Sequence, residues 1–117
     1  MFEWVDFLDL AEELAARPDD EAAARTAVSR AYYAAFHTGR DYLDRAEIPL
    51  DRGRNAHVQV QRELRKQSVQ MGQDLELLHF WRKNADYDMQ QLADVNEQAR
   101  SAVTLARETI DAIKALS

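Results

Sequence analysis

Helix-breaking residues are scarce in this chain, which has three glycines and two prolines in 117 residues. Between them, apolar side chains recur at intervals of three and four residues, the spacing of one helix face. The longest such segment, 20–44, is rich in alanine, the strongest helix former. Its inward-facing positions are predicted to be Val28, Tyr32, Ala35, Phe36, Gly39 and Leu43. No segment has a strand-like pattern, so the sequence predicts an all-α fold.

Four further helices are predicted by the same pattern, over 3–16, 55–70, 73–84 and from 94 to the end of the chain. Pro18 ends the first of them, and Gly72 separates the helix before it from the helix after it. Asp20 and Asp94 supply side-chain acceptors for exposed backbone N–H groups at helix starts. The polar segment 84–94 lacks a helical period and predicts a bent connection. We expect an up-and-down bundle of about five helices.

Length and composition suit a single globular domain, 1–117. Hydrophobic residues make up 46% and charged residues 31% of the chain, which argues against a disordered segment. The small core and the weakly apolar helix over 55–70 favour a homodimer. The chain lacks cysteine, a basic N-terminal start and an apolar run of the roughly 18 residues that cross a membrane. We therefore expect a cytoplasmic protein with no membrane partner.

Charge is unevenly distributed along the chain, whose net charge is -6. This value argues against a general nucleic-acid coat protein. One segment is nevertheless basic and contains a single acid, Glu63, among Arg52, Arg54, Arg62, Arg65 and Lys66. Two interpretations remain open for it: a solvated helix face, or a local surface that binds a polyanion.

A second stripe of side chains runs along the predicted helix over 20–44. With Tyr32 and Phe36 facing the core, one other face carries residues at i, i+3, i+7 and i+10, namely Arg30, Tyr33, His37 and Arg40. The stripe is polar, aromatic and cationic, which makes it a candidate for binding RNA or a nucleotide. The alternative is an ordinary interface with neighbouring helices.

The segment 82–88 holds an arginine, two acids and a tyrosine close to a predicted helix end. Arg82 can hold a phosphate through two hydrogen bonds and keeps its charge at any working pH. Asp86 and Tyr87 follow it, and a tyrosine hydroxyl can donate, accept or be modified. The alternative is a structural Arg–Asp pair that closes the helix, with Tyr87 packed over the end of the bundle.

Other catalytic signatures are missing from the sequence. The three glycines lie too far apart to form a phosphate-binding loop. His37, His57 and His79 lack the spacing of metal ligands on a helix, and each is predicted to be a surface or core residue and not a ligand. We therefore expect neither a metal ion nor a cofactor.

Two stretches together resemble the HEPN family (higher eukaryotes and prokaryotes nucleotide-binding). Ser-Arg-Ala-Tyr-Tyr-Ala-Ala-Phe-His at 29–37 is similar to a recurring pattern in the family's long second helix. Arg-x-x-Ala-Asp-Tyr-Asp at 82–88 is similar to the motif that many stand-alone prokaryotic members carry before their last helix. His57 lies where such members often have a histidine that opens the third helix. The resemblance covers most of the chain.

This resemblance implies a dimeric helical bundle, with the second helix and the arginine motif of both subunits near one cleft. Many family members are metal-independent ribonucleases, several are toxins, and others bind nucleotides or assist a nucleotidyltransferase. In the nuclease members a histidine follows the arginine a few residues later. Arg82 matches that arginine, but Tyr87 stands in the place of the histidine. Lys83 replaces the polar residue that often follows the arginine.

The predicted function is a HEPN-type protein of a two-component, toxin–antitoxin-like module that works with a nucleotidyltransferase-type partner. It would be an atypical, metal-independent endoribonuclease, with catalytic candidates Arg82, Asp86 and Tyr87. The candidates for binding RNA or a nucleotide are Arg30, Tyr33, His37 and Arg82. A tyrosine has a pKa of about 10 and is a poor base at neutral pH. His37 would replace it as the base only if the fold brings it within hydrogen-bond reach. The alternative is a non-catalytic nucleotide-binding or protein-interaction module.

Overall fold

The computed structural model of the chain describes residues 1–50, 53, 55–87 and 94–116. It contains five helices: α1 (Val5–Ala15), α2 (Glu21–Arg45), α3 (Ala56–Gln67), α4 (Val69–Tyr87) and α5 (Val95–Lys114). The described residues form no strand, so the predicted all-α fold is confirmed. None of the helices in the described ranges is long and apolar enough to span a membrane.

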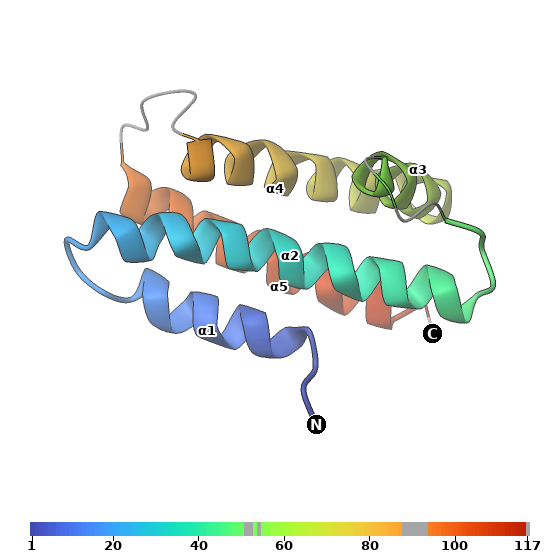
Figure 1. Cartoon of the computed structure of the whole chain (residues 1–117), viewed down its shortest axis with the longest axis horizontal. Coiled ribbons are helices and arrows are strands. Elements are labelled where there is room, and N and C mark those ends of the chain that lie inside the picture. The colour runs from blue at the N-terminus through green and yellow to red at the C-terminus, as the bar shows by residue number, and fades with distance from the viewer. Residues whose placement is uncertain (51–52, 54, 88–93, 117) are drawn as a thin grey trace.

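The long helices lie side by side and alternate in direction, as Figure 1 shows. The chain runs in one direction along α1 and α4 and in the opposite direction along α2 and α5. The shorter α3 lies across the N-terminal half of α4 and is seen nearly end-on in this view. Helix α2 contacts each of the four other helices, so it is the central element of the bundle.

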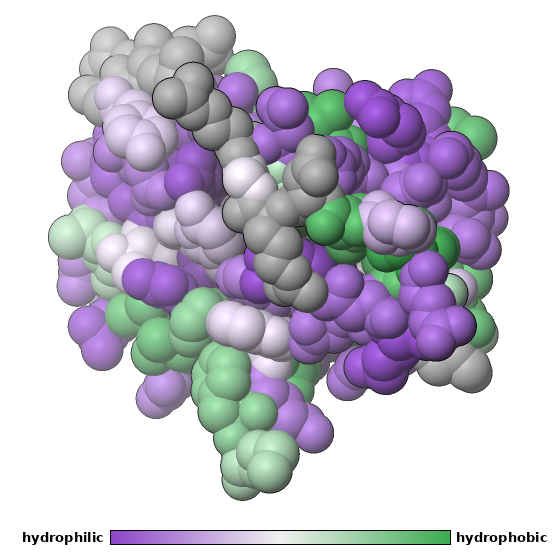
Figure 2. All heavy atoms as spheres, turned by 45° about the vertical axis from the view of Figure 1, so that its right-hand side comes forward, coloured by the Kyte–Doolittle hydropathy of each residue, from purple (hydrophilic) through white to green (hydrophobic). Residues whose placement is uncertain are grey.

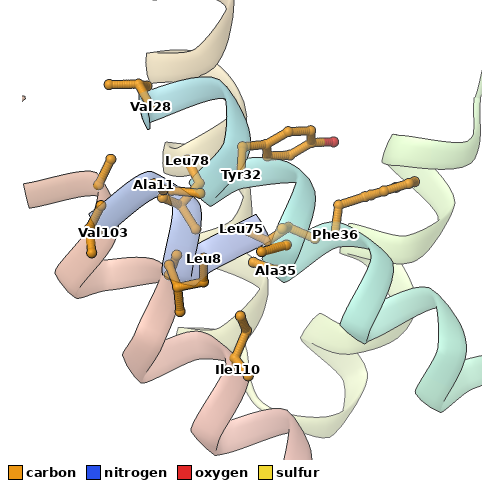
Figure 3. Packing of buried hydrophobic residues seen from close by; sticks show 14 of the residues in the cluster. Leu8, Ala11, Val28, Tyr32, Ala35, Phe36, Leu75, Leu78, Val103 and Ile110 are labelled. Atoms are coloured by element: carbon orange, nitrogen blue, oxygen red, sulfur yellow. The ribbon is translucent and has the colours of Figure 1, made fainter. Parts of the chain in front are cut away.

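Small side chains allow α2 to occupy this central position. Asp20 caps its start, where the side-chain Oδ1 accepts a hydrogen bond from the Ala23 N–H at 3.0 Å, as predicted. Alanines on several faces of the helix are buried and let the neighbouring backbones approach closely. Figure 3 shows side chains from four helices meeting in the core, with labels on Leu8, Ala11, Val28, Tyr32, Ala35, Phe36, Leu75, Leu78, Val103 and Ile110. The Tyr32 hydroxyl points away from the other labelled side chains.

Gly39 on α2 fits against α3 because it has no side chain. A Cβ at this position would lie 2.8 Å from the Leu64 Cδ1 and 3.4 Å from the Val60 Cγ1. Both of these α3 residues are fully buried. The glycine therefore serves a close helix–helix contact within a continuous α2 helix.

Gly72 does not separate two helices, and that prediction is wrong. The break falls at Ser68, whose extended backbone ends α3 and whose hydroxyl accepts a hydrogen bond from the Met71 N–H at 3.3 Å. Gly72 lies in the first turns of α4, where an added Cβ would come within 2.5 Å of the Arg65 Cβ. The glycine allows α3 and α4 to pack tightly. From the sequence alone, a glycine with this role looks the same as a glycine that breaks a helix.

The predicted bent connection over 84–94 is also wrong in its first part. Helix α4 continues to Tyr87, and the buried Asn84 and Ala85 lie on its inner face. The rest of that connection, 88–93, lies outside the described residues, as do Arg52 and Arg54 of the predicted basic segment. Arg82, Asp86 and Tyr87 therefore lie on the last turns of a helix.

Most of the surface in the view of Figure 2 is hydrophilic. Hydrophobic side chains form separate green areas, including a projection at the lower edge, at the height where Figure 1 shows the N-terminus. The exposed large hydrophobic side chains of α3 and α4 are Val58, Val69, Leu77, Phe80 and Tyr87. Arg62, Arg65 and Lys66 of the predicted basic segment are exposed on α3.

Candidate functional site

The Arg82 guanidinium is held between α2 and the last turn of α4. Its Nη2 donates a hydrogen bond to the Tyr33 hydroxyl at 2.6 Å. Its Nε lies 3.2 Å from the Asp86 Oδ2 in an ion pair, although the N–H does not point at that oxygen. The Ser29 hydroxyl on α2 donates to the same carboxylate oxygen at 3.2 Å. The predicted residues Tyr33, Arg82 and Asp86 thus meet in one network.

Three tyrosine rings surround the same guanidinium. The Arg82 Cζ lies 5.2 Å from the ring centre of Tyr33, 5.7 Å from that of Tyr87 and 6.0 Å from that of Tyr32. Aromatic faces attract a guanidinium within about 6 Å, so the rings fix its position without consuming its N–H donors. Tyr87 is 66% exposed. It therefore does not pack over the end of the bundle, as one interpretation of the sequence predicts. Tyr32, in contrast, is buried in the core.

Arg25 ties the end of α4 to α2. Its Nη1 donates to the Ala85 carbonyl at 2.8 Å and to the Asn84 carbonyl at 3.5 Å. These carbonyls belong to the last helical turn, where backbone acceptors lack partners within the helix. The contact holds the turn that carries Arg82 and Asp86 against the central helix.

Two histidines stack on each other within reach of the Arg82 charge. The rings of His57 on α3 and His79 on α4 are parallel, with centres 3.5 Å apart. The His57 Nδ1 and the Tyr32 hydroxyl share a hydrogen bond at 2.8 Å. The His79 Nδ1 is buried and has no hydrogen-bond partner among the described residues. The sequence gives no sign of this pair, since residues distant in sequence bring the rings together.

The pair is held in its neutral form at pH 7. Burial, followed by the charges of Lys83 and Arg82, lowers the pKa of His57 from 6.5 to about 4. Burial, then His57 itself and the same two cations, lowers the pKa of His79 to about 4. Burial is also the main cause that raises the pKa of Tyr32 well above its usual range, so its hydroxyl stays protonated.

Arg30 and His37, the other predicted binding residues, face α1. The His37 ring stacks on Trp4 with centres 3.8 Å apart, and its Nδ1 lies 3.2 Å from the Arg40 Nη2. Burial, followed by the Arg40 charge, lowers the pKa of His37. Arg30 lies over the Phe7 ring at 5.0 Å. The nearest group of the Arg82 network to which His37 is in ring contact is Tyr33, whose ring centre is 6.0 Å away.

The arrangement can hold an anion and handle a proton. Tyr33 and Asp86 contact the Nη2 and Nε of Arg82, and within the described ranges no contact involves its Nη1. A guanidinium carries five N–H donors, so the Nη1 of Arg82 can still donate to a phosphate oxygen. Among the same residues, no three histidine, aspartate or glutamate side chains lie together in a way that could hold a metal ion. Comparisons with family models, curated proteins and solved structures found no significant match to the chain.

Proposed function

We propose that the chain is a HEPN-type protein that binds the phosphate of RNA or of a nucleotide at Arg82. The observation that carries the proposal is the position of this guanidinium, which is 15% exposed and fixed by Tyr33, Asp86 and three aromatic rings. A preorganised arginine binds phosphate well because its fork geometry matches two oxygens. The neighbouring tyrosine rings offer faces on which a base can stack.

The same site supports metal-independent cleavage of RNA. Such cleavage needs a group that accepts the proton of the ribose hydroxyl and a cation that stabilises the charge on the phosphate. Arg82 supplies the cation, and Asp86 and Tyr87 adjoin it. The charge of Arg82 acts on the neutral His57 and His79, whereas His37 stacks on Trp4. They are therefore better candidates than His37 for the role of the missing motif histidine.

The biological context that we propose is a cytoplasmic, two-component, toxin–antitoxin-like module with a nucleotidyltransferase-type partner. It rests on the resemblance of 29–37 and 82–88 to HEPN motifs. The exposure of Tyr87 suits a residue that a partner enzyme reaches and modifies. We also propose a homodimer, because Val58, Val69 and Phe80 on α3 and α4 are exposed apolar side chains that contact with a second copy would bury.

A second candidate function is nucleotide binding or protein interaction without catalysis. Tyr87 in place of the motif histidine favours it, since tyrosine is a poor base at neutral pH. Both functions use the same Arg82 site, so one experiment addresses them together.

The test compares wild-type protein with Arg82→Ala in cleavage of labelled RNA in EDTA and in binding of the dinucleotide UpU. We expect the substitution to reduce cleavage at least about tenfold, because it removes the charge at the phosphate. Cleavage by neither protein, with UpU binding that Arg82→Ala weakens, would select the non-catalytic function. If Arg82→Ala leaves both cleavage and binding unchanged, the proposed site is wrong.

Two variants serve as controls. Arg82→Lys keeps the charge but loses the forked geometry, so an intermediate effect is expected. Arg100→Ala removes an exposed arginine from α5 and should leave cleavage and binding unchanged. Thermal melting of each variant separates loss of the site from loss of the fold.

A further inference from the structure

Four groups that can carry positive charge lie together where α3 meets α4. They are the stacked His57 and His79, and the cations Arg82 and Lys83, whose charges act on both rings. Stacked rings 3.5 Å apart cannot both be protonated without strong repulsion, so the pair can take up one proton at most.

If the pair takes up a proton in the free protein, the groups that face it do not compensate the positive charge. From α2 it meets the Tyr32 hydroxyl, which stays protonated, and the Tyr33 hydroxyl accepts a hydrogen bond from Arg82. From α4 it meets Arg82 and Lys83. Asp86 is the one acid in the Arg82 network of the described residues, and it already binds Arg82 and Ser29. A buried nitrogen without a partner, the His79 Nδ1, adds a further cost.

We propose that a phosphate group bound at Arg82 and Lys83 is taken up together with one proton, which the His57–His79 pair accepts. An anion at this place would reverse the local field, because its charge attracts the proton that the two cations repel. The arrangement costs stability in the free protein and becomes favourable with an anion present. The inference rests on the proposed phosphate-binding function and adds the proton as a second ligand.

Proton uptake makes the affinity for phosphate depend on pH in a defined direction. Because the complex binds more protons than the free protein, affinity rises as pH falls from 7 to 5, by about tenfold over the whole range.

The experiment is isothermal titration calorimetry of the full chain with UpU at pH 6, in two buffers with different ionisation enthalpies. UpU carries one phosphodiester charge and no group that titrates near this pH, so any proton taken up enters the protein. We expect roughly half a proton per bound UpU. Uridine 5′-monophosphate forms the second arm, and the tighter ligand of the two identifies a phosphodiester or a terminal phosphate as the natural group.

The matched variant is His57→Asn with His79→Gln, which keeps polar groups but removes both titratable rings. It should bind UpU with no proton uptake and with an affinity that no longer rises towards low pH. UpU binding by the wild type without proton uptake overturns this inference and leaves the proposed function intact. Absence of binding by both ligands overturns the inference and the proposed function together.

A second measurement avoids dependence on the folding of the double variant. NMR titration of the histidine ring protons in wild-type protein, with and without UpU, reports the pKa of each ring directly. We expect the pKa of His57 or His79 to rise by about two units when UpU is bound, the shift that places roughly half a proton on the pair at pH 6. An unchanged pKa for both rings overturns the inference.

Discussion

Two groups of stacked rings flank α2, and their contacts differ in kind. In the α1 cluster (Trp4, Phe7, Arg30 and His37), the histidine stacks on a tryptophan and Arg30 lies over Phe7. In the α3–α4 cluster (Tyr32, His57, His79, Arg82 and Lys83), histidine stacks on histidine and the cations act on both. Similar residue types therefore make favourable contacts on one side of α2 and mutually repelling contacts on the other.

The difference indicates which cluster stabilises the fold and which serves a ligand. Aromatic stacking and cation–π contacts are favourable in the free protein, so the α1 cluster needs no further partner. Half-buried histidines beside cations cost free energy, and such groups gather at functional sites. We therefore expect substitutions in the α1 cluster to change stability, and those in the α3–α4 cluster to change binding and pH dependence.

The largest expected effect on stability comes from Trp4→Ala. Trp4 contacts Phe2, Phe7 and His37, so its removal should lower the free energy of unfolding by about 2–3 kcal/mol, measured by urea denaturation. UpU affinity should change less than about twofold. A tenfold loss of affinity would mean that the two clusters are not separate.

Acidification should weaken the fold through the α3–α4 cluster. The pKa values of His57 and His79 are 6.5 in the unfolded chain and about 4 in the folded protein, so the unfolded state binds more protons between these values. The free energy of unfolding should therefore fall as pH decreases from 6.5 to 4, by about 1–3 kcal/mol after allowance for partial exposure. Urea denaturation across this range measures it.

The double variant His57→Asn with His79→Gln should show a flatter pH dependence over the same window. An unchanged slope in that variant would contradict the assignment of the effect to this pair. His37, whose pKa is also lowered by burial, remains in the variant and accounts for the residual slope.

Tyr32→Phe should have a smaller effect. It removes the hydroxyl that shares a hydrogen bond with the His57 Nδ1 and leaves the buried ring in place. We expect a loss of about 1 kcal/mol in the free energy of unfolding, measured by thermal or urea denaturation. Tyr33→Phe is the matched variant, because it removes the hydroxyl that binds Arg82 and should mainly weaken UpU binding.

Arg30→Gln should have the smallest effect. Its contact with Phe7 is a cation–π interaction at 5.0 Å on a half-buried side chain, worth about 0.5 kcal/mol of unfolding free energy. UpU affinity should fall less than about threefold. A loss comparable to that of Arg82→Ala would place Arg30 at the phosphate and join the α1 cluster to the site.

The helical period predicts most of the fold, because burial of one face of each helix requires apolar residues at intervals of three and four in the sequence. Asp20 and Asp94 mark helix starts for the same reason: a capping side chain acts on its own segment, and Asp94 accepts from the Glu97 N–H at 3.0 Å. Gly72 misleads, since its small size serves contact with Arg65 on another helix. The polar end of α4 misleads too, because Arg25 of α2 holds it in helical form.

The site is predictable only where its residues lie on one helix. Tyr33 is singled out by its position on the α2 face, and Arg82 and Asp86 by their spacing of four residues. The His57–His79 stack depends on how α3 turns back onto α4, which no local pattern records. One signal was present: His79 lies three residues before Arg82, so both share a face of α4.

The central position of α2 has a consequence for hydrogen exchange. Because α2 contacts every other helix, its backbone N–H groups become accessible to solvent only when the whole bundle opens. The amides around Ser29 and Tyr33 should therefore exchange with deuterium at the rate set by global unfolding. Ser29 and Tyr33 hydrogen-bond to Asp86 and Arg82. The arginine is therefore attached to the slowest-opening helix and keeps its position while the outer helices fluctuate.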